Sequence, residues 1–282
     1  MAAPRTLVTG GSGHLGSVVM RRLGAAAGAV AFDVKPPQDA AMPHIIGSIL
    51  SLADLDAAMS GIEAVVHVAG IPNPRDKPPE IVFDTNVRGS WNVCHAAARA
   101  GVKRLVLISS ECATGLCYQK AEFPPEYLPI DESYPLRPAE VYGLSKVAAE
   151  TVAASFARGG KIDVTVLRPT FILFRHNHPE IAARADLFHR DLWGWVEPED
   201  VAQAVELALD KVRGFEIFFV SAPNTLVVEP TLDLVRRRFG RLPEIRRPAL
   251  YEANPNAALF DIAKAERLLG YRPSGDWRAH LA

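Results

Sequence analysis

The sequence predicts an α/β fold in which a parallel sheet is covered by helices on both faces. From residue 4 to about residue 170, short apolar runs alternate with longer Ala-rich segments of helical spacing, which is the pattern of βαβ units. Several of these runs, such as Ala64-Val65-Val66 and Leu105-Val106-Leu107-Ile108, are apolar at every position. Runs of this kind are typical of strands that are buried on both sides.

The same patterns place the individual elements. We expect strands at residues 4–9, 29–33, 44–47, 63–69, 104–109 and 162–168, and helices at 14–27, 51–59, 80–100 and 141–158. The alternation loosens after about residue 170, where we expect a helix at 198–211, a strand at 215–220 and helices at 229–239 and 260–269. Residues 1–170 therefore form the expected main unit, and residues 171–282 form a small lobe that is interleaved with it.

Composition excludes several classes of protein. The chain has 31 Lys and Arg residues against 32 Asp and Glu residues, so its net charge of −1 offers no field to attract nucleic acid or anionic lipid. No apolar run reaches the roughly 18 residues that a membrane helix needs. Its three cysteines form no CxxC pair, as expected in a reducing compartment. Because the first strand-like run begins at Thr6, we expect no signal peptide and a cytoplasmic location.

A glycine-rich turn follows the first expected strand and opens the first expected helix. It reads Gly10-Gly11-Ser12-Gly13-His14-Leu15-Gly16. Glycines at these positions let the backbone approach a pyrophosphate closely, and the helix N-terminus supplies N–H donors for its charge. The sequence therefore predicts a Rossmann-type dinucleotide site, with contacts from Gly10, Gly13, His14, Leu15 and Gly16. A plain strand-to-helix turn is the alternative.

Asp33 closes the second expected strand. An acidic side chain at this position can accept hydrogen bonds from the adenosine ribose and would repel a 2′-phosphate, which favours NAD over NADP. The alternative is an Asp that caps a helix or faces solvent.

Tyr142 and Lys146 are spaced by one helical turn, and the apolar positions after them indicate a helix. A lysine ammonium near a phenol stabilises the phenolate, so that the tyrosine can exchange a proton with a substrate hydroxyl or carbonyl.

With these motifs in place, the chain resembles the extended short-chain dehydrogenase/reductases, in particular their NAD-dependent epimerase/dehydratase branch. The resemblance covers nearly the whole chain. It rests on the glycine turn, His67-Val68-Ala69-Gly70, Asn86-Val87-Arg88-Gly89-Ser90, Leu107-Ile108-Ser109-Ser110, Tyr142 to Lys146, Leu167-Arg168-Pro169-Thr170, Trp195 to Ala202 and Ala265 to Pro273.

The resemblance implies a role for each motif. Ser110 would be the third catalytic residue, because relatives place it five positions before a loop glycine, here Gly115. Tyr142 would be the general acid/base, and Lys146 would also bind the nicotinamide ribose. Further cofactor contacts would come from Ser48 or the Ile49 backbone, from Val68, Ala69 and Gly70, and from Asn86 and Pro169. A helix cap is the alternative for Asn86.

Departures from the family pattern narrow the reaction. Glu111 and Cys112 follow Ser110, where dehydratases have Asp and then Glu, which counts against that chemistry. Glu111 and Thr170 would instead contact substrate, with a surface position as the alternative for Glu111. The segment from Thr170 to Trp193 is shorter than in nucleotide-sugar enzymes of the branch, which favours a small substrate. In this brevity the chain is similar to uronate dehydrogenases, although it lacks their Asn-His after the serine.

The short segment after Thr170 is rich in cations. Among them we choose Arg175 as the residue that would bind a substrate carboxylate or phosphate. Three histidines in this segment lack the context of a metal site, and we expect no metal: His176, His178 and His189.

These observations predict an enzyme that transfers hydride from a small sugar, sugar acid or polyol to NAD through Ser110, Tyr142 and Lys146. The alternative enzyme is a nucleotide-sugar epimerase that uses the same residues. A redox-sensing NAD-binding module is a third hypothesis, although such relatives usually lose the tyrosine or the lysine. Relatives commonly form homodimers through the helices around 80–100 and 141–158, so we expect a homodimer with no nucleic-acid or membrane partner.

Overall fold

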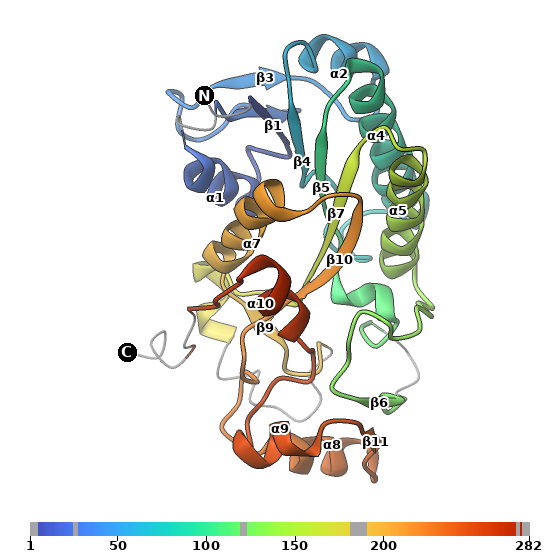
Figure 1. The fold of residues 1–282 in the computed structure, drawn as a ribbon, viewed down its shortest axis with the longest axis vertical. Coiled ribbons are helices and arrows are strands. Elements are labelled where there is room, and N and C mark those ends of the chain that lie inside the picture. Colours follow the sequence, from blue (N-terminus) through green and yellow to red (C-terminus); the bar gives the residue numbers. More distant parts are fainter. Residues whose placement is uncertain (1–4, 25–27, 119–122, 181–190, 275–276, 278–282) are drawn as a thin grey trace.

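A seven-stranded parallel sheet runs through the centre of the molecule (Figure 1). This computed structural model describes residues 5–24, 28–118, 123–180, 191–274 and 277. The strands lie in the order β10-β7-β5-β4-β1-β2-β3. Their bounds are β1 Thr6–Thr9, β2 Val30–Asp33, β3 His44–Ile46, β4 Ala64–His67, β5 Arg104–Ile108, β7 Asp163–Pro169 and β10 Phe215–Val220.

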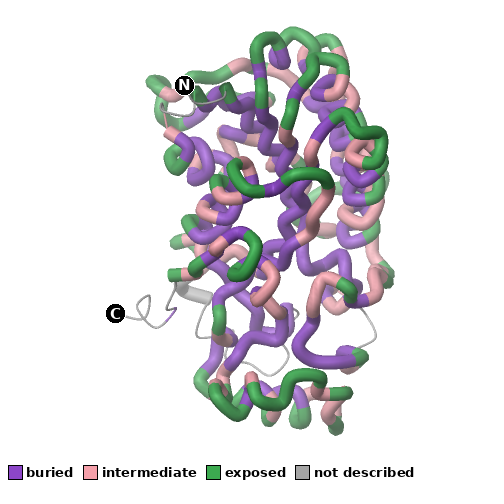
Figure 2. The backbone as a smooth tube through the Cα atoms, viewed as in Figure 1, coloured by how far each residue is buried: buried purple, intermediate pink, exposed green. Residues whose placement is uncertain are grey.

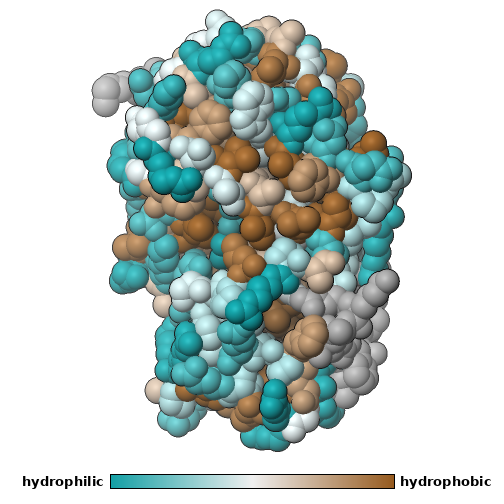
Figure 3. Space-filling view, turned by 90° about the vertical axis from the view of Figure 1, so that its right-hand side faces the viewer, coloured by the Kyte–Doolittle hydropathy of each residue, from teal (hydrophilic) through white to brown (hydrophobic). Residues whose placement is uncertain are grey.

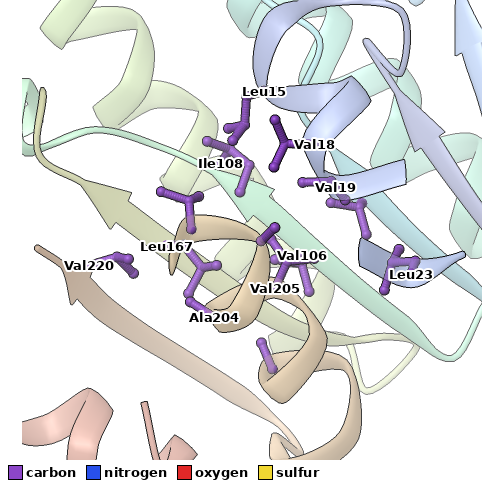
Figure 4. Close-up of a cluster of buried hydrophobic side chains, with 14 of the residues drawn as sticks. Leu15, Val18, Val19, Leu23, Val106, Ile108, Leu167, Ala204, Val205 and Val220 are labelled. Carbon is purple, nitrogen blue, oxygen red and sulfur yellow. The ribbon is translucent and has the colours of Figure 1, made fainter. Parts of the chain in front are cut away.

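Helices cover both faces of this sheet (Figure 1). One face carries α1 (His14–Leu23), α7 (Pro198–Lys211) and α10 (Ala263–Leu269), and the other carries α2 (Leu52–Ala58), α4 (Gly89–Ala100) and α5 (Val141–Arg158). Each face has its own apolar core, and the sheet between them is buried along most of its length (Figure 2). On the α1 side, side chains of α1 and α7 meet those of β5 and β7 (Figure 4). The predicted doubly wound α/β fold is confirmed.

The smaller lobe lies at one end of the sheet, below it in Figure 1. It contains α8 (Thr231–Phe239), α9 (Pro248–Ala253) and two short parallel pairs, β6 (Tyr127–Leu128) with β11 (Glu244–Ile245) and β8 (Phe171–Ile172) with β9 (Trp195–Val196). β6 therefore comes from the stretch between the expected strand 104–109 and the expected helix 141–158, where no element was expected. Two elements that follow residue 170 belong to the main unit instead: β10 is a strand of the seven-stranded sheet, and α7 packs on one face of it.

Two expected helices differ from the structure in a way that affects the site. The expected helix 80–100 is divided into α3 (Pro79–Phe83), a π-helical segment (Asp84–Arg88) and α4. The wider π turn carries Asn86, and segments of this type are frequent at functional sites. The expected helix 260–269 begins only at Ala263, because the backbone of Leu259 and Asp261 is bonded to Ile130 instead. Within the described residues, no helix is both long and apolar enough to cross a membrane.

Candidate active site

The glycine turn joins β1 to α1 and leaves no room for side chains. A Cβ on Gly16 would lie 1.9 Å from the Gly10 carbonyl oxygen, and one on Gly10 would lie 2.7 Å from the Ala69 nitrogen. Gly10 also has φ +71°, which favours glycine. Gly13 is the N-cap residue of α1 and has no side chain to cap the helix. The first backbone N–H groups of α1 are therefore not covered by a capping side chain. The turn therefore has the geometry that a pyrophosphate site requires.

Asp33 braces this turn from the end of β2. Its Oδ2 accepts a hydrogen bond of 3.1 Å from the Ser12 backbone N–H, so it is neither a helix cap nor merely solvent-facing. The buried Ser12 hydroxyl has no hydrogen-bond partner within the described chain. An unpaired buried hydroxyl in a glycine-rich turn matches a ligand that brings its own polar groups, and the residues present therefore fit NAD.

The other predicted cofactor residues surround the same edge of the sheet. The amides of Val68 and Ala69 both donate to the Thr9 carbonyl oxygen, at 3.1 Å each. Ser48 is held by Asp54, which accepts a 2.9 Å bond from its N–H. Ile49 is buried, and its carbonyl oxygen accepts a bond from Asn92. Leu15 packs into the apolar core, whereas the exposed His14 packs against the rings of Phe174 and His176.

Asn86 ties the loop after β4 to α5. Its Oδ1 accepts a 2.7 Å bond from the Ile71 N–H, and its Nδ2 donates to the Ile71 carbonyl oxygen and to Ser145 Oγ. Asn86 is therefore a buried bridge rather than a helix cap. Its own carbonyl oxygen accepts a bond from Ser90, whose Oγ lies 3.0 Å from His67 Nε2. His67, which the sequence analysis did not select, thus supports the position of Asn86.

Ser110, Tyr142 and Lys146 converge where β5 ends and α5 begins. Ser110 follows β5, and its Oγ accepts a hydrogen bond of 3.1 Å from the Cys112 N–H. Tyr142 is buried in the first turn of α5, where Glu140 caps the amides of Tyr142 and Gly143. Lys146 Nζ lies 5.6 Å from the centre of the Tyr142 ring and donates to the Ile108 carbonyl oxygen at 2.9 Å. The structure thus brings the three predicted residues together.

Electrostatics around Tyr142 differ from the expectation that Lys146 lowers its pKa. Burial holds the pKa of Tyr142 well above its usual value, Cys112 and Glu111 raise it further, and only a hydrogen bond with Ser110 lowers it. Burial lowers the pKa of Lys146 to about 8, against the opposing effect of Glu150. In this structure desolvation therefore dominates the pKa of both side chains.

Glu111 lies inside the protein beside Ser110, which excludes the surface alternative. Its side chain is buried, and its Oε2 accepts a 3.1 Å hydrogen bond from Ser110. A carboxylate here can contact a substrate held at Ser110 and Tyr142. Cys112 and Cys117 lie next to it and form one buried cluster with Tyr142.

Two of the predicted substrate residues, Thr170 and Arg175, follow the end of β7. Pro169 ends β7 opposite Val220 of β10, and the buried Thr170 hydroxyl donates to Ser221 Oγ at 3.2 Å. Arg175 is exposed and lies in sequence between Phe174 and His176, whose rings contact His14 of the glycine turn. His178 and His189 fall outside the side chains that the structure describes.

Two residues near Tyr142 were not selected from the sequence. Tyr118 stands edge-on to Tyr142, with 6.3 Å between ring centres, and it has φ +57°, an unusual value for a tyrosine. The Arg75 guanidinium lies 5.3 Å above the Tyr118 ring. No periodicity marks either residue, because both lie in irregular segments that only the fold brings together.

A buried ion pair supports the same region from behind. Arg168 of β7 donates two hydrogen bonds to Glu150 of α5, at 2.9 and 2.7 Å, and Ser109 donates to the same carboxylate at 2.5 Å. Glu150 lies one helical turn after Lys146. In the sequence, the only indication of this pair is an arginine, Arg168, within the largely apolar run of β7.

Comparisons with known proteins identify the family of the chain. The model of the NAD dependent epimerase/dehydratase family matches residues 6–220. The L-arabinose 1-dehydrogenase (NAD(P)(+)) of Haloferax volcanii is 28% identical, over 90% of this chain and 98% of that protein. The uronate dehydrogenase of Pseudomonas putida is 30% identical, over 73% of this chain and 71% of that protein.

A solved structure shows the same fold. A short-chain dehydrogenase/reductase superfamily protein from Agrobacterium tumefaciens, crystallised with bound NAD, has a TM-score of 0.74 at 21% identity, over 98% of this chain and 94% of that chain. The family predicted from the motifs is thereby confirmed, and the predicted cofactor, NAD, is the one on which the family depends. The chain belongs to the NAD-dependent epimerase/dehydratase family of enzymes.

Proposed function

We propose that this protein is a dehydrogenase that oxidises a hydroxyl group of a small sugar, sugar acid or polyol. The observation that carries the proposal is the convergence of Ser110, Tyr142 and Lys146 at the end of β5, on the same edge of the parallel sheet as the glycine turn after β1. When bound, NAD supplies the hydride acceptor and the positive charge of its nicotinamide ring. A positive charge beside Tyr142 offsets the effect of burial on its pKa.

The chain's own residues then divide the remaining work. Tyr142 takes the proton of the substrate hydroxyl, and Ser110 steadies the same oxygen by a hydrogen bond. Lys146 binds the ribose of the cofactor and holds positive charge near Tyr142. Ser12, Asp33 and the amides at the start of α1 hold the adenosine and pyrophosphate portions. Asn86 keeps the Ile71 backbone and Ser145 in place, so that α5 presents Tyr142 correctly.

Two observations support a small substrate. The segment from Thr170 to Trp193 is short in sequence, which leaves little chain to cover a nucleotide. The relatives named for L-arabinose and uronate act, by those names, on free sugars and sugar acids. Glu111, Thr170 and Arg175 are the proposed substrate contacts, and Arg75 offers a second cation near Tyr142.

The test is to incubate the purified protein with NAD and a panel of free aldoses, uronic acids and polyols while NADH absorbance is followed. We expect NADH from one class of substrate. Tyr142→Phe should lose at least about a hundredfold in kcat, because it removes the proton acceptor, but should still bind NAD in calorimetry. Tyr251→Phe, a buried tyrosine in the small lobe, is the matched control and should remain active.

A panel that yields no NADH from protein that binds NAD would overturn the dehydrogenase. The alternative to test would then be a nucleotide-sugar epimerase. Its assay measures the interconversion of UDP-sugar epimers without net formation of NADH.

We also propose that the protein pairs with a second copy through α4 and α5. Apolar side chains gather on the face that carries these helices (Figure 3). Four of the large exposed apolar side chains belong to this region: Ile81, Phe83, Trp91 and Leu144. Patches of this kind are often interfaces. Sedimentation equilibrium measures the mass directly, and a monomer at micromolar concentration would rule the dimer out.

A further inference from the structure

Three buried donor groups lie together beside the proposed catalytic serine. Glu111 and Cys112 follow Ser110 in the 3-10 helix Glu111–Thr114, and Cys117 returns to them after the turn at Gly115. Glu111 Oε1 lies 4.0 Å from Cys112 Sγ and 3.9 Å from Cys117 Sγ. The three ligand atoms all lie within 4.8 Å of one another, and all three residues are buried.

These separations are close to those around a tetrahedral zinc ion. With Zn–S distances of about 2.3 Å and Zn–O distances of about 2.0 Å, neighbouring ligands lie about 3.8 Å apart for two sulfurs and about 3.5 Å apart for sulfur and oxygen. The two contacts of Glu111 would have to shorten by about half an ångström, and the two sulfurs already lie within 4.8 Å of each other. Thiolates and a carboxylate suit zinc, whereas magnesium and calcium prefer oxygen ligands alone.

We propose that Glu111, Cys112 and Cys117 form a zinc-binding site next to Tyr142, with the fourth coordination position left for water or another ligand. Three protein ligands and one open position are the arrangement of an accessible zinc site rather than of a closed structural one. From the sequence we expected no metal, because the three histidines considered there lack the context of a metal site, and the cysteines were not considered as ligands. Only the return of the chain after Gly115 brings Cys117 back to Cys112.

The charges around the cluster are compatible with an ion. On binding, the two thiols lose their protons to solvent, so two thiolates, one carboxylate and Zn²⁺ carry a net charge of −1. Lys146 interacts electrostatically with Cys112 and supplies one positive charge, whereas the buried Asp191, which acts on both cysteines, supplies a further negative one. The ion would therefore lie among charges of both signs and not be an isolated buried charge, which would be costly.

Zinc at this site would also alter the proposed reaction centre. Glu111 accepts a hydrogen bond from Ser110 Oγ, and the Cys112 N–H donates to that same oxygen. Drawing Glu111 and Cys112 toward an ion changes both contacts, so we expect zinc to inhibit turnover. This second effect rests on the proposed dehydrogenase activity, whereas zinc binding itself does not.

The binding test uses reduced, chelator-treated full-length protein and Co²⁺ as the first probe. We expect one Co²⁺ per chain, with the near-ultraviolet thiolate-to-cobalt charge-transfer band and the strong visible bands of a tetrahedral site. Zn²⁺ should abolish these bands by displacement. The charge-transfer band separates this cluster from surface histidines, and its absence in the folded wild-type protein would overturn the site without any variant.

Variants then assign the ligands. Cys112→Ser and Cys117→Ser should each weaken Zn²⁺ binding by at least about tenfold, measured against a chromophoric chelator, and should lose much of the charge-transfer band. Glu111→Gln should weaken binding while keeping the band. Cys94→Ser, which alters a buried free cysteine on α4, is the matched control and should bind like the wild type. Equal zinc affinity in the Cys112, Cys117 and Cys94 variants would overturn the proposal.

Discussion

At the level of a single residue, Asp33 has one observed contact and one proposed role. Its carboxylate accepts the Ser12 N–H and so fixes the glycine turn, and it occupies the position from which a ribose would be bound. Asp33→Ala should weaken NAD binding about ten- to a hundredfold, since a hydrogen bond to a charged group is worth about 1.5–3 kcal/mol. The same change should reduce the preference for NAD over NADP, because the repulsion of the 2′-phosphate is removed.

Calorimetric titration with both cofactors measures this prediction. Asp39→Ala, an exposed aspartate in the loop after β2, is the control and should leave both affinities unchanged. Unaltered affinities in the Asp33 variant would refute the assignment.

Individual residues also show where sequence reasoning reaches its limit. The glycine turn, Tyr142 and Lys146 could be proposed from the sequence because their predicted roles depend on local spacing along one turn or one helix. The burial of Glu111, the raised pKa of Tyr142 and the approach of Cys117 depend on how distant segments pack, and no spacing encodes them. His67 gave only a weak signal, as the single polar side chain in the apolar run of β4.

At the level of elements, the Glu150–Arg168 pair joins α5 to β7. Its two side chains are only 5% and 2% exposed. Removing one partner leaves the other charge buried, so Glu150→Ala should lower the free energy of unfolding by about 3–5 kcal/mol. The double variant Glu150→Leu with Arg168→Met should recover much of this loss, because replacing both charges leaves none unpaired.

Urea unfolding checks this prediction. Asp233→Ala, which breaks the exposed pair of Asp233 with Arg236, should cost less than about 1 kcal/mol and provides the comparison. A Glu150 variant as stable as this control would show that the buried pair does not hold α5 against the sheet.

Some boundaries of the helices follow from local sequence patterns, and others depend on contacts with distant residues. α5 and α7 were predicted at the residues that the structure has, Val141–Arg158 and Pro198–Lys211. A continuous helix was expected over 80–100, yet the π segment interrupts it where Asn86 binds Ile71 and Ser145. Helical periodicity cannot reveal such an interruption, because it responds to side-chain hydrophobicity and not to the partners of one buried amide.

At the level of the whole molecule, His67 couples the folding of several elements to pH. It links β4 to Thr9 of β1 at 2.7 Å and to Ser90 of α4 at 3.0 Å. Burial, assisted by the nearby charge of Lys146, lowers the pKa of His67 to about 3. The unfolded chain binds a proton at this histidine below about pH 6.5, whereas the folded chain does not until about pH 3. The unfolded state therefore holds more protons in that interval, and stability must fall as pH falls through it.

The free energy of unfolding, measured by urea between pH 6.5 and 5, should decrease toward lower pH with a contribution of up to about 1.4 kcal/mol per unit from His67. Lys146, with a pKa of about 8, stays charged over this range, and most carboxylates titrate below it. His67→Gln should show a shallower slope, while His44→Gln, at an exposed histidine, should keep that of the wild type. If the slopes of the wild type and His67→Gln coincide, His67 is not the group that connects acid to unfolding of the sheet.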